Sequence, residues 1–121
     1  MRRIIPPLAA LLTLAVFSPA YAGYVGTLET PSFTVTIKNN CEEGVVSCDD
    51  VTYTGVSKKN GSRITLKGET LHTYSADGTP SRFLGYEFRS GDYVYQALED
   101  GTLWVTKGGK DVLVEHGKWD W

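Results

Sequence analysis

The sequence predicts an all-β fold, a small antiparallel meander of about seven to eight strands that forms a barrel or a sandwich and carries one disulfide bond. Three observations predict it. Apolar and polar residues alternate with a period of two from residue 33 onward, which places successive side chains on opposite faces of a sheet. Turn signals recur about every ten residues from residue 50 onward, and tight turns make neighbouring strands antiparallel. Outside the N-terminal leader, no segment has the period of a helix.

The first 22 residues have the three parts of a secretory signal peptide. Two arginines follow Met1, residues 8–17 are a short apolar core, and an A-x-A cleavage motif ends at Ala22. An apolar run of about ten residues is too short to span a bilayer. We therefore divide the chain into a signal peptide, 1–22, and one mature domain, 23–121, which we expect to be secreted to the bacterial periplasm.

The mature domain is mildly acidic. Of the 12 Lys and Arg residues, Arg2 and Arg3 leave with the signal peptide, so ten face 14 Asp and Glu residues, a net charge of −4. A negative domain repels a phosphate backbone, so no nucleic acid partner is expected. Gly23 follows the cleavage site where a lipoprotein would carry cysteine, and no second long apolar stretch follows. We therefore expect neither a lipid anchor nor a membrane span.

The strands can be placed in chain order. Residues 23–32 are expected to be a loose lead-in, because Pro31 argues against a central strand there. The segment 33–37 alternates Phe, Val and Ile with threonine, and 51–56 is rich in β-branched and aromatic residues, so both are expected strands. An Asn-Gly dipeptide, a strong hairpin signal, then leads into a short alternating strand over 63–67.

Hairpins continue through the second half of the domain. A weaker strand over 70–74 ends in an Asp-Gly-Thr-Pro turn. The next strand is expected to place Leu84, Tyr86 and Phe88 on one face. Turns that contain glycine separate the remaining expected strands, which are 82–89, 93–98, 102–106 and 111–115, and residues 118–121 close the chain.

The two cysteines are expected to form one structural disulfide. Cys41 and Cys48 enclose six residues, and a secreted chain with two cysteines usually pairs them. Closing so small a ring stabilises the fold by about 2–3 kcal/mol in the chain-entropy description. A redox pair is more often spaced C-x-x-C, and a zinc site would need two more ligands. Neither His72 nor His116 has a suitable spacing to the cysteines, and both are expected at the surface.

Four carboxylates surround the expected disulfide loop, namely Glu42, Glu43, Asp49 and Asp50. Such a patch would steer a cationic protein partner and raise its association rate. Clustered carboxylates also suit calcium, but the spacing of a calcium-binding loop is missing, so no metal site is assigned. The alternative interpretation is a solvated loop that needs charge to remain soluble.

Seven aromatic residues lie in the last third of the chain: Tyr86, Phe88, Tyr93, Tyr95, Trp104, Trp119 and Trp121. Strands favour aromatic residues for cross-strand packing, so most of this set is expected in the core. Tyr and Trp are also enriched at interfaces, since they bury a large area and keep one polar group. Trp104 lies between two threonines on its face of the strand and is the expected exposed contact.

Catalysis has little support in the sequence. No G-x-S-x-G elbow accompanies the Ser, His and Asp residues. Gly108-Gly109 joins two expected strands and is not followed by a helix, so it does not form a phosphate-binding loop. Residues 23–121 also leave little room for a substrate cleft. We therefore expect a protein that is not an enzyme and needs no cofactor.

Two short motifs lie in neighbouring expected hairpins, Ser90-Gly-Asp-Tyr93 and Trp104-Val-Thr-Lys-Gly108. They resemble the motifs of bacterial periplasmic C-type lysozyme inhibitors, small β-barrels whose motif loops plug the lysozyme cleft. The resemblance implies that Ser90, Tyr93, Thr106 and Lys107 contact the enzyme, with Lys107 offered to its catalytic carboxylates.

The chain departs from that family in three ways. The Ser-Gly to Tyr spacing is one residue short, Thr102 stands where the family has tyrosine, and the family's disulfide joins distant strands. The resemblance covers fewer than about 20 residues and assigns no family.

These observations favour a non-enzymatic module that binds or inhibits another envelope or extracellular protein, such as a cell-wall hydrolase of the lysozyme type. The expected contact residues are Glu42, Glu43, Asp49, Asp50, Ser90, Tyr93, Trp104, Thr106 and Lys107. Two alternatives stay open, a periplasmic carrier of a small apolar ligand and an envelope structural protein.

Overall fold

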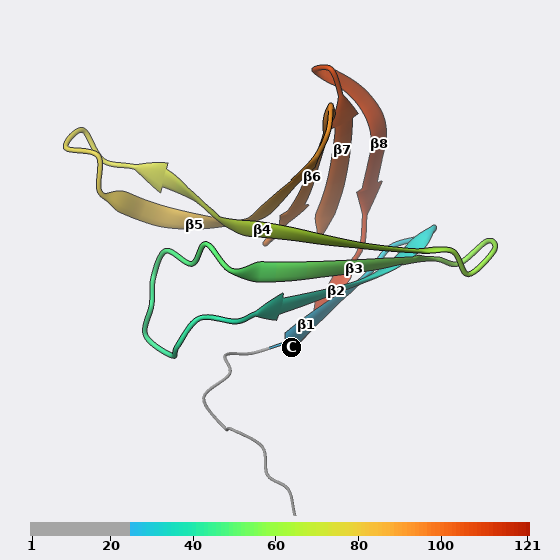
Figure 1. Ribbon diagram of the computed structural model, residues 1–121, viewed down its shortest axis with the longest axis horizontal. Coiled ribbons are helices and arrows are strands. Elements are labelled where there is room, and N and C mark those ends of the chain that lie inside the picture. Colours follow the sequence, from blue (N-terminus) through green and yellow to red (C-terminus); the bar gives the residue numbers. More distant parts are fainter. Residues whose placement is uncertain (1–24) are drawn as a thin grey trace, which may run out of the picture.

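The computed structural model describes residues 25–121, which form nine β-strands (Figure 1). The strands are β1 (Val25–Glu29), β2 (Phe33–Asn39), β3 (Val51–Ser57), β4 (Arg63–Tyr74), β5 (Pro80–Ser90), β6 (Tyr93–Leu98), β7 (Thr102–Lys107), β8 (Lys110–His116) and β9 (Lys118–Asp120). Across this range, no helix is long and apolar enough to cross a membrane. The expected signal peptide and its cleavage site lie outside the described residues.

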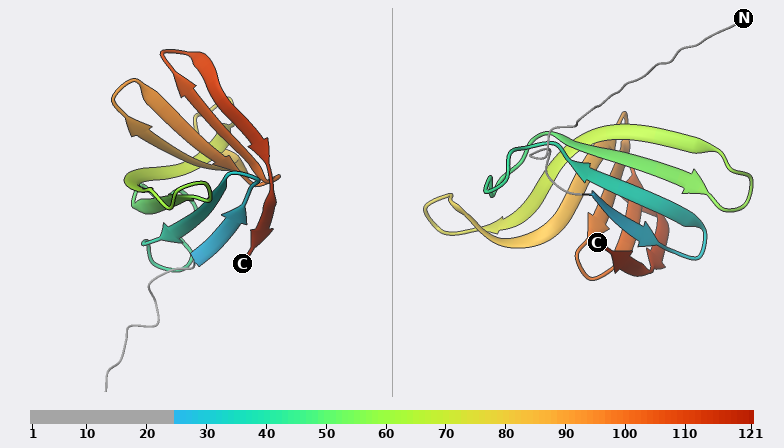
Figure 2. Two further views of the ribbon diagram at one scale, coloured as in Figure 1. Left: turned by 90° about the vertical axis from the view of Figure 1, so that its right-hand side faces the viewer. Right: turned by 90° about the horizontal axis from the view of Figure 1, so that it is seen from below.

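All nine strands belong to one antiparallel sheet in the order β8-β7-β6-β5-β4-β3-β2-β1-β9. From β1 to β8, each strand pairs with its neighbours in sequence, so the predicted meander is confirmed. The sheet curls into a nearly closed barrel, as the views in Figure 2 show. Because there is one sheet and not two, the barrel is the correct alternative and the sandwich is not.

The barrel closes where β8 passes into β9. These strands are one run of chain, which ends its pairing with β7 at His116 and begins its pairing with β1 at Lys118. Between them, the Gly117 amide donates a hydrogen bond to the Gly101 carbonyl at 2.8 Å. A Cβ on Gly117 would collide with the backbone of Glu29, so only glycine fits the closed geometry.

A carboxylate holds the outer edge of β8 to the turn between β1 and β2. The Ser32 amide donates to Glu115 Oε1 at 3.0 Å, and the Ser32 hydroxyl donates to Oε2 at 2.5 Å. Burial alone would raise the pKa of Glu115, but the hydrogen bonds outweigh burial and hold this pKa below its ordinary value. The contact is therefore made by the charged carboxylate.

Acid should weaken this contact. The pKa of Glu115 is lower in the folded chain than the ordinary value of 4.5, so its contribution is complete above about pH 4.5 and is lost as the pH falls through the folded-state pKa. We expect Glu115→Gln to lower the free energy of unfolding by about 1–2 kcal/mol at neutral pH and by less near pH 3. Urea denaturation of both proteins at the two pH values measures this difference. Glu69→Gln, at an exposed carboxylate, is the control and should have little effect at either pH.

The N-terminal half differs from expectation in two places. Residues 25–29 are not a loose lead-in but strand β1, and Pro31 lies in the turn after it, where its missing amide does not interrupt a sheet. The segments 63–67 and 70–74 are one strand, β4, which continues through Gly68. A Cβ on Gly68 would crowd the ring of Phe88 on the paired strand, so glycine serves close packing here and not a turn. These two differences cancel in the strand count, and β9 makes the ninth strand of the sheet.

A β-bulge in β5 reverses the expected orientation of Leu84. The pairing of β4 with β5 skips this residue, and the following Gly85 has a φ of 145°. A bulge adds one residue and so exchanges the two faces of the strand. Phe83 therefore packs inward, with its ring centroid 5.3 Å from that of Tyr86, while Leu84 lines an outer groove with Trp104.

The same irregularity buries His72, which was expected at the surface. His72 pairs with Phe83 beside the bulge and is 5% exposed, with its ring edge against the Phe83 ring. Neither of its ring nitrogens has a hydrogen-bond partner in the described part of the chain. His116 is exposed, as expected, and its Nδ1 lies 3.1 Å from the Thr102 hydroxyl.

The core fills the inside of the barrel with side chains from β1 to β7. Its largest members are Tyr53, Tyr86 and Phe88, and the rings of Tyr53 and Phe88 lie 5.1 Å apart. Smaller residues complete it: Leu28, Val35, Ile37, Cys48, Val51, Ala97, Leu103 and Val105. Most of the aromatic set is predicted to lie in the core. Tyr86 and Phe88 are fully buried there, and Tyr93, Tyr95 and Trp119 are half-buried against it.

Candidate functional site

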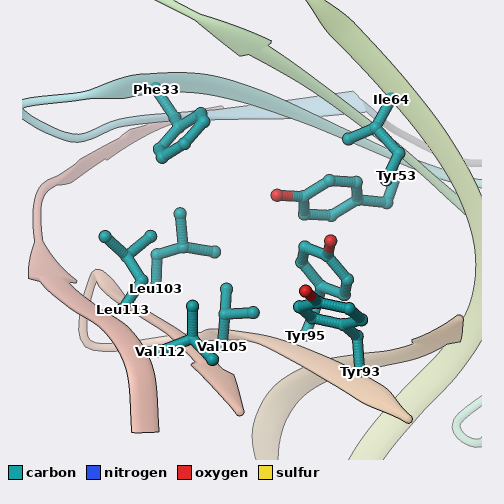
Figure 3. A pocket seen from close by; sticks show the side chains of 9 residues that line it. All are labelled: Phe33, Tyr53, Ile64, Tyr93, Tyr95, Leu103, Val105, Val112 and Leu113. Carbon is teal, nitrogen blue, oxygen red and sulfur yellow. The ribbon is translucent and has the colours of Figure 1, made fainter. Parts of the chain in front are cut away.

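An apolar cavity of about 250 Å³ opens into the barrel between β2, β3 and β4 on one side and β6, β7 and β8 on the other (Figure 3). Nine side chains line it: Phe33, Tyr53, Ile64, Tyr93, Tyr95, Leu103, Val105, Val112 and Leu113. None of these side chains carries a charge at neutral pH. The cavity therefore suits an apolar group and would disfavour a charged one.

A second β-bulge shapes the mouth of the cavity. The pairing of β7 with β8 passes from Val105 and Leu113 to Thr106 and Asp111, so Val112 has no partner on β7. Two consecutive residues, Val112 and Leu113, thereby border the cavity, which regular alternation would not allow. Val112 is 55% exposed and forms part of the outer edge of the opening.

Three tyrosine hydroxyls are the polar groups of the lining. Tyr53 is only 2% exposed, and its hydroxyl points from β3 into the cavity in Figure 3. Burial, and then the neighbouring Tyr95, raise the pKa of Tyr53 far above its ordinary value, so this hydroxyl stays protonated. The rings of Tyr53 and Tyr95 lie 5.5 Å apart, and those of Tyr95 and Tyr93 lie 6.2 Å apart.

Two turns, residues 90–93 and 107–110, lie beside the cavity. We call these two turns together the basic rim. The Gly108 amide donates to the Asp92 carbonyl at 3.0 Å, which ties one turn to the other. Gly108 and Gly109 both have positive φ, as a two-residue hairpin turn of this kind requires. Lys107 Nζ lies 5.4 Å from the centre of the Tyr93 ring, within range of a cation–π contact.

The structure brings three of the four residues of the resemblance together. Ser90 pairs with Tyr93, and Tyr93 pairs with Lys107, so the three follow one another across β5, β6 and β7. Thr106 belongs to the outer surface, where it borders a shallow groove with Trp104. Tyr93 thus belongs both to the basic rim and to the cavity wall.

Trp104 is exposed, as expected, at 39% of its surface. Its indole Nε1 donates to Asp111 Oδ1 at 2.8 Å, which fixes the ring against the outer face of β8. The ring also borders a second outer groove that contains Leu84 and Gln96. Trp104 and Thr106 therefore form an outer patch, which faces away from the cavity.

The disulfide between Cys41 and Cys48 is present, with the two Cα atoms 5.9 Å apart. The Thr70 amide donates to the Cys48 carbonyl at 2.8 Å, and the Cys48 amide donates to the Thr70 hydroxyl at 2.9 Å. These bonds anchor the end of the loop to β4.

The acidic residues of this loop do not join the basic rim. The loop connects β2 to β3, at the opposite end of the strands from the turns of the rim, and Figure 1 shows it at the left while those turns lie at the top. Glu42, Glu43, Asp49 and Asp50 are all exposed, and Asp50 forms an ion pair with Lys67 at 2.8 Å. The hydrogen bond from Lys67, helped by one from Asn40, lowers the pKa of Asp50. Among residues 25–121, no three His, Cys, Asp or Glu residues lie close enough to share a metal ion.

Three of the four residues implied by the resemblance lie in the basic rim, whereas the lining of the cavity was not predicted from the sequence. The lining comes from six strands, and two of its members, Val112 and Leu113, face the cavity together only because of a bulge. The one available signal was the period-two spacing of Tyr93 and Tyr95, which places both on the face of β6 that lines the cavity. Comparison of the chain with protein-family models, curated proteins and solved structures gives no match.

Proposed function

We propose that this protein is a non-enzymatic module that binds another envelope or extracellular protein through its basic rim. The observation that carries the proposal is the position of Lys107. Its ammonium group is exposed, lies over the Tyr93 ring beside Ser90, and takes part in no ion pair within the described range. A cation held in this way is available to a carboxylate of a partner.

A cell-wall hydrolase of the lysozyme class fits this chemistry best. Such enzymes work with a pair of carboxylates that flank the bond to be cleaved. Both turns of the rim project from the sheet in Figure 1, so Lys107 can reach into a cleft that contains those groups. Glu42, Glu43 and Asp49 lie too far along the strands to share this contact, and they would act on a basic enzyme by long-range steering.

The site of action is proposed to be the periplasm. Two features support it, the leader pattern of residues 1–22 and the disulfide, because disulfides persist in oxidising compartments. The small size of the chain and the absence of a catalytic motif in its sequence favour binding over catalysis.

Lys107→Ala should weaken partner binding by about 10- to 100-fold, the usual loss at a central contact of an interface. The measurement is the affinity of the purified, oxidised protein for a panel of immobilised lysozymes and for proteins of a periplasmic extract. Lys38→Ala, which removes the same charge from an exposed position on β2, is the matched control and should bind normally. Capture of no protein at micromolar concentration, or equal losses in both variants, would overturn the proposal.

A second function, carriage of a small apolar ligand, is favoured by the cavity itself. It predicts that organic extraction of the purified protein releases a bound molecule of low polarity. Stable self-association of the protein without ligand or partner would instead favour a structural role in the envelope.

A further inference from the structure

We infer that the barrel cavity is a specific site for a small neutral molecule that has one aromatic ring or a short apolar chain and one hydroxyl group, such as an alkylphenol. This inference rests on the second function above and names the class of its ligand. It is independent of the basic rim, because the cavity and the rim share only Tyr93.

The size of the cavity limits the ligand. A dry, apolar cavity of about 150 Å³ is known to accept benzene. At about 250 Å³, the present cavity has room for one ring with a short substituent and is too small for a long acyl chain. Its lining residues are all aliphatic or aromatic, as binding of an apolar body requires.

The Tyr53 hydroxyl indicates the polar group of the ligand. Tyr53 is 2% exposed, and its hydroxyl points into the apolar cavity in Figure 3. A ligand hydroxyl that pairs with it there gains affinity and orientation. The Tyr95 hydroxyl lies in the same part of the cavity, so a ligand hydroxyl can accept from one tyrosine and donate to the other.

The lining also indicates a neutral ligand. None of the nine lining residues is Asp, Glu, Lys, Arg or His, so a buried charge would have no counter-charge. Lys107 contacts the Tyr93 ring at the rim and is not part of the lining. A phenol or an alcohol therefore fits better than a carboxylate.

The test compares two probes, 4-ethylphenol and ethylbenzene, which differ by one hydroxyl group. Titration calorimetry on the oxidised protein should show that 4-ethylphenol binds about tenfold more tightly, the usual value of one hydrogen bond. In Tyr53→Phe, the preference for 4-ethylphenol should fall because only the Tyr95 hydroxyl remains, while ethylbenzene binds as it does to the original protein. A preference that is unchanged in Tyr53→Phe would overturn the role of this hydroxyl.

A second pair of variants tests the location. Val112→Trp places a large ring at the mouth of the cavity and should abolish binding of both probes. Val114→Trp is the matched control, since Val114 is on the same strand, is 48% exposed, and is not part of the lining. The proposed site would be wrong if the two variants bound the probes equally, or if neither probe bound the original protein at its highest soluble concentration. Lys107→Ala should leave probe binding unchanged, so failure of the ligand site is distinguishable from failure of the protein-binding proposal.

Discussion

Gly101→Ala should destabilise the barrel far more than the same substitution at Gly78. Both glycines have positive φ, 97° and 87°, so each variant carries the strain of a left-handed alanine, about 1–2 kcal/mol. At Gly78 the new methyl group meets open space. At Gly101 it would collide with the Gly117 carbonyl and break the 2.8 Å hydrogen bond at the closure. We expect a total loss of about 3–5 kcal/mol at Gly101.

Urea denaturation of the two variants separates conformational strain from the collision. Because a domain of this size is stable by about 5–15 kcal/mol, Gly101→Ala should remain measurable but marginal. Amide exchange should then be fastest in β9, whose pairing with β1 depends on the bend at Gly117. Equal losses of stability in Gly101→Ala and Gly78→Ala would mean that contact between Gly101 and Gly117 does not hold the barrel closed.

The regular strands could be predicted because their signals are local. The alternation over 33–37, 93–98 and 102–106 identified β2, β6 and β7, which have one inward and one outward face. The Asn60-Gly61 dipeptide marked the turn between β3 and β4, and Gly61 has the positive φ that such a turn requires. The disulfide could be predicted because the chain has two cysteines and an N-terminal pattern typical of secreted proteins.

The bulges and the closure could not be predicted, because neither has a local signal. A bulge at Leu84 or Val112 adds one unpaired residue, after which a count with period two assigns the wrong face. The closure pairs β1 with β9, and only the complete meander brings these two short strands together. In the same way, the cavity is assembled from six strands, whereas the basic rim belongs to two turns whose residues are close in sequence.

Phe88→Ala should lower the free energy of unfolding by about 3–5 kcal/mol, the usual result of removing a fully buried phenylalanine ring. Phe88 has no exposed surface, is not part of the cavity lining, and packs against Tyr53 with ring centres 5.1 Å apart. Phe33→Ala is the matched control. Phe33 is half-buried at the cavity wall, so its loss should be clearly smaller. Urea denaturation measures both changes, and equal losses would mean that the core is not centred on Phe88.

The same variant also shows whether the core positions the site. Tyr53 contacts the Phe88 ring and also lines the cavity, so a void at residue 88 gives the Tyr53 ring room to move. If packing by Phe88 keeps the Tyr53 hydroxyl pointed at the ligand, Phe88→Ala should reduce the preference for 4-ethylphenol over ethylbenzene under conditions in which the variant is folded. A preference that stays at its original value would show that the hydroxyl is oriented by the strand and by Tyr95, and that Phe88 contributes only to stability.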